Sequence, residues 1–86
     1  FTAARANLAI VLYKQNRFAE AGEVLEQVLA QDPGNVSSRN LLAATLGRIG
    51  DYDEAIAIYG ELTQTFPDHA KLWMSYGHLL KTVGRQ

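Results

Sequence analysis

The sequence predicts an all-α fold, a solenoid of antiparallel helix-turn-helix pairs with five helices in 86 residues. Three observations predict it. A pattern of residues returns every 34 positions, the apolar residues within each repeat recur at the spacing of one helical face, and asparagine, glycine or proline separates the helical stretches. Hydrophobic residues make up 48% of the chain and charged residues 20%, which is typical of a folded globular protein and not of a disordered one.

The period becomes visible when the chain is laid over itself with an offset of 34 residues. KQNRFAEA then lies over RIGDYDEA, and Pro33 lies over Pro67. Asn16, Gly50 and Gly84 share one repeat position. We therefore expect three successive units, namely 1–34 as the first, 35–68 as the second, and 69–86 as the first helix of an incomplete third unit that caps the second.

Each full unit is expected to form two helices. Ala21, Leu25 and Val28 follow the spacing of one apolar helical face, and the second unit repeats this spacing. Asn16 and Gly50 stand where the first helix of a unit ends and a positive φ is often needed, while proline ends the second helix. The five expected helices cover 2–15, 18–30, 36–49, 52–65 and 69–83.

These residues resemble the tetratricopeptide repeat, whose 34-residue pattern is W-x2-L-G-x2-Y followed by Ala, Phe, Ala and Pro. In the third unit the first four positions carry Trp73, Tyr76, Gly77 and Leu80. The matching residues of the two earlier units are Leu8, Ala9, Leu12, Ala21, Leu25 and Pro33, and then Leu42, Ala43, Leu46, Ala55, Tyr59 and Pro67. The sequence departs from the pattern at Arg5, Arg39, Val28 and Leu62. The resemblance covers the whole chain and implies a helical superhelix that acts as a protein-binding scaffold.

A narrower resemblance concerns FPDHAKLWMSYGHLLKTVGRQ and NLLAATLGRIGDYDEAIAIY. Both stretches are similar to repeats of bacterial proteins that carry tetratricopeptide arrays ahead of a sulfotransferase domain. The resemblance implies a bacterial parent enzyme that transfers a sulfuryl group from an adenylyl-sulfate donor. The present sequence contains no glycine-rich loop of the kind that holds a phosphate group, so that activity is expected to lie outside this chain.

The residue types of this chain do not form the patterns that catalysis or metal binding requires. The sequence has no cysteine, and His69 and His78 are nine residues apart, which is not a helical ligand spacing. No serine has the histidine and carboxylate partners of a nucleophile. We therefore expect no catalytic residue, no cofactor and no metal site. The longest apolar run, LAIVLY, is six residues long, too short for a bilayer, and no signal-peptide pattern is present, so we expect a cytoplasmic protein.

The charges divide between the two kinds of helix, although the formal net charge is only −1. Every Lys and Arg falls on the first helix of a unit or on the turn after it, while the acidic residues lie on second helices or in turns. If first helices line a concave groove, as the family resemblance implies, the groove is basic and can bind an acidic peptide. The residues expected there are Asn7, Ile10, Tyr13, Lys14, Asn40, Arg48, Met74, Ser75, His78 and Lys81.

A second explanation for the basic residues remains open. Lys14, Arg48 and Lys81 lie in the last turns of expected helices, where cations complement the helix dipole without any ligand. Chaperone-tail binding is not expected, because of the groove positions that grip such tails in this family only Lys71 carries a matching residue. Nucleic acid is not expected either, since eight basic residues against nine acidic ones form no sustained basic patch.

Two functional hypotheses follow. The first is an interaction scaffold that binds a peptide or a partner domain, and the second is a recognition segment of a sulfotransferase that contacts an adjoining catalytic domain. A further expectation concerns the last helix, whose partner is missing from the sequence. Trp73, Tyr76 and Leu80 are expected to face that missing helix, so the chain is expected to self-associate or to borrow a neighbour's helix, as a piece of a longer array would.

Overall fold

The chain forms five α-helices within residues 2–84, the part that the structure, a computed structural model, describes. The all-α prediction is confirmed. The expected bounds of the third and fourth helices are correct, and the others differ by one residue at one or both ends. The helices are α1 (Thr2–Lys14), α2 (Phe18–Gln31), α3 (Val36–Ile49), α4 (Tyr52–Thr65) and α5 (Ala70–Thr82).

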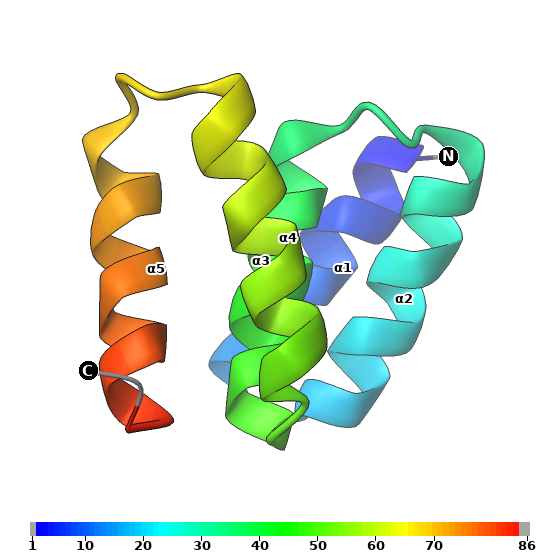
Figure 1. Cartoon of the computed structure of the whole chain (residues 1–86). Helices are drawn as coiled ribbons and strands as arrows, with labels where there is room; N and C mark the ends of the chain where they lie inside the picture. Colours follow the sequence, from blue (N-terminus) through cyan, green and yellow to red (C-terminus); the bar gives the residue numbers. More distant parts are fainter. Residues whose placement is uncertain (1, 85–86) are drawn as a thin grey trace.

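The helices pack antiparallel in chain order, each against the next, in a molecule of 39 × 25 × 18 Å (Figure 1). The first helices of successive units also touch, α1 with α3 and α3 with α5. Within the described residues, α2 and α4 make no such contact. The first helices therefore form a continuous inner row, and the second helices form a more widely spaced outer row.

The turns inside the units are built on one repeat position. Asn16, Gly50 and Gly84 all have a positive φ, of 65°, 108° and 76° respectively, as the repeat predicts for the first two. This left-handed conformation ends a helix and turns the chain back, and it favours glycine or asparagine. At the start of α3, the Asn35 side chain accepts a hydrogen bond of 3.0 Å from the backbone N–H of Ser38. This cap satisfies one of the free donors at the helix N-terminus.

Small residues at repeated positions hold the helix pairs together. Ala9 and Ala43 on the first helices, and Ala21 and Ala55 on the second helices, all have 0% exposed surface. An alanine at such a position lets two helix backbones approach closely, and the larger core residues then pack around the contact. Those larger residues include Leu12, Leu25, Val28, Leu42, Leu46, Tyr59 and Leu62.

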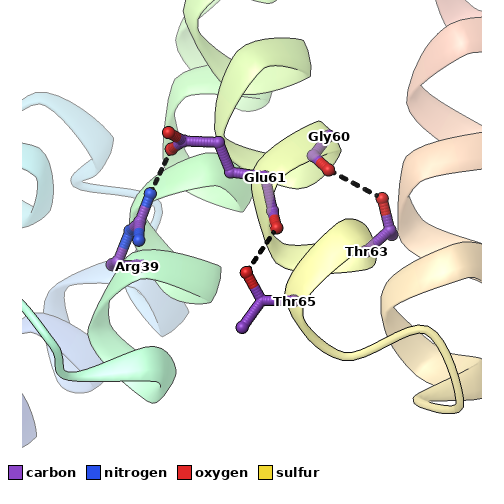
Figure 2. Close-up of polar contacts among 5 residues, drawn as sticks. All are labelled: Arg39, Gly60, Glu61, Thr63 and Thr65. Carbon is purple, nitrogen blue, oxygen red and sulfur yellow. Dashed lines mark hydrogen bonds and ion pairs between the residues drawn. The ribbon is translucent and has the colours of Figure 1, made fainter.

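The polar contacts around α4 combine one link between helices with two local bonds. The guanidinium of Arg39 on α3 forms an ion pair with the carboxylate of Glu61 on α4 (Figure 2). Nearby, the Thr63 hydroxyl donates to the Gly60 carbonyl at 3.0 Å, and the Thr65 hydroxyl donates to the Glu61 carbonyl at 2.9 Å. Because Thr63 is buried, its bond to the preceding turn of the helix avoids the cost of an unpaired hydroxyl.

The close helix contacts predict a sharp difference between two equivalent positions. Ala43→Leu is expected to lower the free energy of unfolding by about 1–3 kcal/mol or more, because the larger side chain overpacks a filled contact. Gly77→Ala is the matched control, since a Cβ added at Gly77 meets no atom within 4 Å. There, the better helix propensity of alanine is expected to stabilise the chain by up to about 1 kcal/mol.

Urea unfolding followed by circular dichroism measures both changes. If Ala43→Leu unfolded at the same urea concentration as the parent chain, alanine would not be required at this helix contact.

Candidate functional site

The inner row of helices encloses an open cavity with a volume of about 690 Å³. This is within the range of small-ligand and side-chain pockets, roughly 300–1,000 Å³. Most of its lining comes from α3 and α5, with one residue from α1 and one from α4. The lining residues are Tyr13, Ala43, Ala44, Gly47, Arg48, Tyr59, Met74, Ser75, His78, Leu79 and Thr82.

Half of the residues expected in the groove line this cavity. They are Tyr13, Arg48, Met74, Ser75 and His78. The other five expected residues, Asn7, Ile10, Lys14, Asn40 and Lys81, are not among its lining residues. Lys81 does not share the repeat position of Lys14 and Arg48. The residue 34 positions after Arg48 is Thr82, and it is Thr82 that lines the cavity.

Phe18, the first residue of α2, fixes the position of one wall of the cavity. Its ring contacts the Tyr13 ring edge to face, with 5.2 Å between the ring centroids. The Arg48 guanidinium lies over the Phe18 ring, 5.1 Å from its centroid, in the range of a cation–π contact. Phe18 thus joins the first unit to the second and holds both Tyr13 and Arg48 at the cavity.

The floor of the cavity consists of small residues that sequence reasoning did not select. Ala43, Ala44 and Gly47 lie along one side of α3 and leave room above them. A Cβ added at Gly47 would lie 3.3 Å from a Leu79 side-chain carbon, so glycine at this position allows α3 and α5 to approach. The sequence signal for this floor is the segment AATLG, in which three of five residues are alanine or glycine. A search for clusters of small residues on the expected first helices would have identified it.

Tyr59 reaches the cavity from α4, a second helix, and is 4% exposed. Burial raises the pKa of its phenol above 10.0, because a phenolate loses its hydration there, while a hydrogen bond with the Ser75 hydroxyl acts in the opposite direction. At neutral pH Tyr59 therefore presents a neutral hydroxyl. The expectation that only first helices would line the groove overlooked a side chain long enough to pass between them.

The lining is free of carboxylates and carries one permanent cation. Arg48 and His78 are the basic side chains among the lining residues, and no Asp or Glu is present there. Two other arginines are engaged elsewhere: Arg17 pairs with Glu20 at 2.7 Å, and Arg39 pairs with Glu61. Among the lining residues the permanent positive charge is therefore that of Arg48 alone.

Among the described residues, no group of three or more His, Cys, Asp or Glu side chains is arranged to hold a metal ion. No helix in that part of the chain is long and apolar enough to cross a membrane.

The three residues expected to face a missing helix lie together on α5. Trp73 is 47% exposed, while Tyr76 and Leu80 are half-buried. The indole N–H of Trp73 donates a hydrogen bond of 2.8 Å to the Pro67 carbonyl, and the Trp73 and Tyr76 ring centroids are 6.1 Å apart. Trp73 therefore has a structural role of its own, because it fastens the loop between α4 and α5.

Stacked helix pairs with a hollow inner face define a class of protein, the α-helical repeat proteins that bind partners along a concave surface. Comparison with family models identifies the Tetratricopeptide repeat over residues 2–68. The chain belongs to this family, whose members generally serve as protein–protein interaction modules. A search of curated proteins gave no match. Neither comparison supports the resemblance to sulfotransferase-associated repeats.

The buried phenol of Tyr59 predicts a change in stability at alkaline pH. In the unfolded chain Tyr59 ionises near its ordinary pKa of 10.0, while in the folded chain its pKa is higher. From about pH 10 up to the folded pKa, the unfolded state therefore binds fewer protons than the folded state, and the free energy of unfolding falls as the pH rises. Tyr59→Phe is expected to show a smaller loss of stability over this window.

Urea unfolding between about pH 8 and pH 11 measures this difference. Tyr52→Phe, at a half-buried position on the same helix, serves as the matched control and should follow the parent chain. Equal pH slopes for Tyr59→Phe and the parent chain would exclude Tyr59 as the source of the alkaline loss.

Proposed function

We propose that this chain is a protein interaction module that binds an extended peptide across its inner face. In this proposal an acidic group of the peptide pairs with Arg48, and a neighbouring apolar side chain enters the cavity. The observation that carries the proposal is a cavity of about 690 Å³ lined by residues of four helices, with an arginine and a histidine but no carboxylate in its lining.

The position of Arg48 favours an anionic ligand. Its guanidinium stacks on Phe18 and so loses little additional side-chain freedom when it binds a carboxylate. The residue remains exposed, so its charge is accessible from the solvent. His78 and the hydroxyls of Tyr13, Tyr59 and Ser75 add further hydrogen-bonding groups to the lining.

The small floor residues favour an apolar side chain next to that acidic group. Ala43, Ala44 and Gly47 leave a shallow hollow, and Met74 and Leu79 add apolar surface beside it. Met74 is 72% exposed, and a flexible thioether can adapt to different apolar groups. A peptide with a bulky apolar residue beside Asp or Glu therefore suits the cavity better than a purely acidic one.

The alternative hypothesis, a recognition segment for an adjoining sulfotransferase domain, rests only on the sequence resemblance and stays a prediction. No contact or residue of the described chain favours it over peptide binding.

Arg48→Glu is expected to weaken the binding of acidic peptides by roughly 10- to 100-fold, because it removes a charge-assisted hydrogen bond and adds a repulsive charge. Fluorescence polarisation with a labelled peptide library tests this, using peptides in which Phe or Leu stands beside Glu and matched peptides in which Lys replaces the Glu. The acidic set should bind the parent chain more tightly.

Arg5→Glu is the matched control, since Arg5 is an exposed arginine on α1 that does not line the cavity. It makes the same change in net charge and should retain most of the affinity. Circular dichroism should show unchanged helicity in both variants. An equal loss in both would mean that only overall charge matters, and undiminished binding by Arg48→Glu would rule out Arg48 as the anchor.

A further inference from the structure

The middle unit carries less side-chain bulk on the inner face than the units on either side of it. Two repeat positions of the first helices show this, occupied in successive units by Ile10, Ala44 and His78 and by Tyr13, Gly47 and Lys81. At both positions the small residue is the one on α3, and both small residues line the cavity of about 690 Å³. The cavity therefore lies where the middle unit lacks side chains that its neighbours have.

The small size of Gly47 has a packing reason. A Cβ added there would lie 3.3 Å from a Leu79 side-chain carbon, closer than an ordinary van der Waals contact. A larger residue at this position would therefore push α3 and α5 apart, and a change there would alter the fold together with the cavity.

Ala44 has no such packing reason. It is half-buried, whereas the adjacent Ala43, which lies at the helix contact, has 0% exposed surface. The large residues at the equivalent positions, Ile10 and His78, are both exposed, Ile10 by 41%. The fold thus accommodates a large side chain at this repeat position in two of its three units, and alanine at position 44 leaves the space empty.

We propose that Ala44 determines the size of the side chain that the cavity accepts, namely one bulky apolar side chain such as Phe or Leu. This inference rests on the proposed peptide binding and adds the residue that sets its size preference. Arg48 follows Ala44 by four residues on α3, so the two lie one helical turn apart on the same face. A ligand whose acidic group pairs with Arg48 therefore has its neighbouring side chain within reach of Ala44.

Three hydroxyls of the lining are already partnered and do not oppose an apolar occupant. The Thr82 hydroxyl donates a hydrogen bond of 2.9 Å to the His78 carbonyl, and the hydroxyls of Tyr59 and Ser75 are hydrogen-bonded to each other. An apolar side chain that displaces water from these groups leaves their hydrogen bonds in place. It therefore avoids the cost of an unsatisfied buried hydroxyl.

Other side chains suit the space above Ala44 less well. A lysine or arginine of the ligand would find no carboxylate among the lining residues and would be repelled by Arg48. An alanine would leave most of the apolar lining exposed to water. A bulky apolar residue covers that lining and requires no charged partner.

The test compares three peptides that are identical except for the residue next to Glu, which is Phe, Leu or Ala. Fluorescence polarisation with the whole chain gives the affinity of each peptide. The parent chain is expected to bind the Phe and Leu peptides roughly tenfold more tightly than the Ala peptide, because the larger side chains bury more apolar surface.

Ala44→Ile introduces the residue that the first unit carries at the same repeat position. It is expected to reduce the tenfold preference to about 1, by weakening the Phe and Leu peptides while the Ala peptide stays within about twofold of its parent affinity. Retained binding of the Ala peptide also shows that the variant is folded and that Arg48 is still accessible. Ala44→Leu, with a better helix former, should give the same result.

Ile10→Ala makes the reverse exchange at the equivalent position on α1. It is the matched control, because Ile10 is not among the residues that line the cavity, and it should retain the preference of the parent chain. An equal fall of the preference in Ile10→Ala and Ala44→Ile would overturn the assignment to Ala44.

The remaining outcomes separate this inference from the proposed function. An unchanged preference in both Ala44 variants, or an equal loss of all three peptides in both, would overturn the role of Ala44 in size selection. Equal binding of the three peptides by the parent chain, with binding still weakened by Arg48→Glu, would overturn this inference and leave peptide binding at Arg48 intact. Binding of none of the peptides would contradict the proposed function as well.

Discussion

The structure depends on close contact between helices through small residues at repeated positions. Ala9, Ala21, Ala43 and Ala55 have no exposed surface, and each belongs to a helix that packs against its neighbour in the chain. An 86-residue chain can bury only a thin core. Close backbone approach therefore matters more here than in a larger domain, because it brings the surrounding leucines and valines into contact with both helices at once.

The same contacts determine where the inner face can be hollow. The alanines determine the packing within each helix pair. The distance between one unit and the next is determined separately, by Gly47 against Leu79 and by Phe18 against Arg48. These inter-unit contacts leave space above the small side chains of α3. The cavity is thus a consequence of how the units are stacked, and its chemistry comes from the few side chains long enough to reach it.

The inner and outer helices carry charges of opposite sign. The acidic residues of the outer helices offset the basic residues of the inner ones, which keeps the net charge near zero while each helix remains strongly charged. Arg39 on α3 forms an ion pair with Glu61 on α4, so its charge is balanced within the fold. Within the described residues Arg48 forms no ion pair with a carboxylate, and we propose a partner for this residue.

The sequence by itself determined the helices, their order and the turns between them. These features depend on local chemistry, such as the positive φ at Asn16 and Gly50 and the prolines after the second helices. The 34-residue period then places the same local signals in each unit. It also identified five residues that line the cavity, because a helical period fixes which residues share a face. The tertiary structure alone decided that Tyr59 reaches the cavity from an outer helix and that Thr82, not Lys81, lines its wall. The physical reason is that a helical period fixes the direction of each side chain around its own axis, whereas the distance between neighbouring helices is determined by the side chains that meet across the contact.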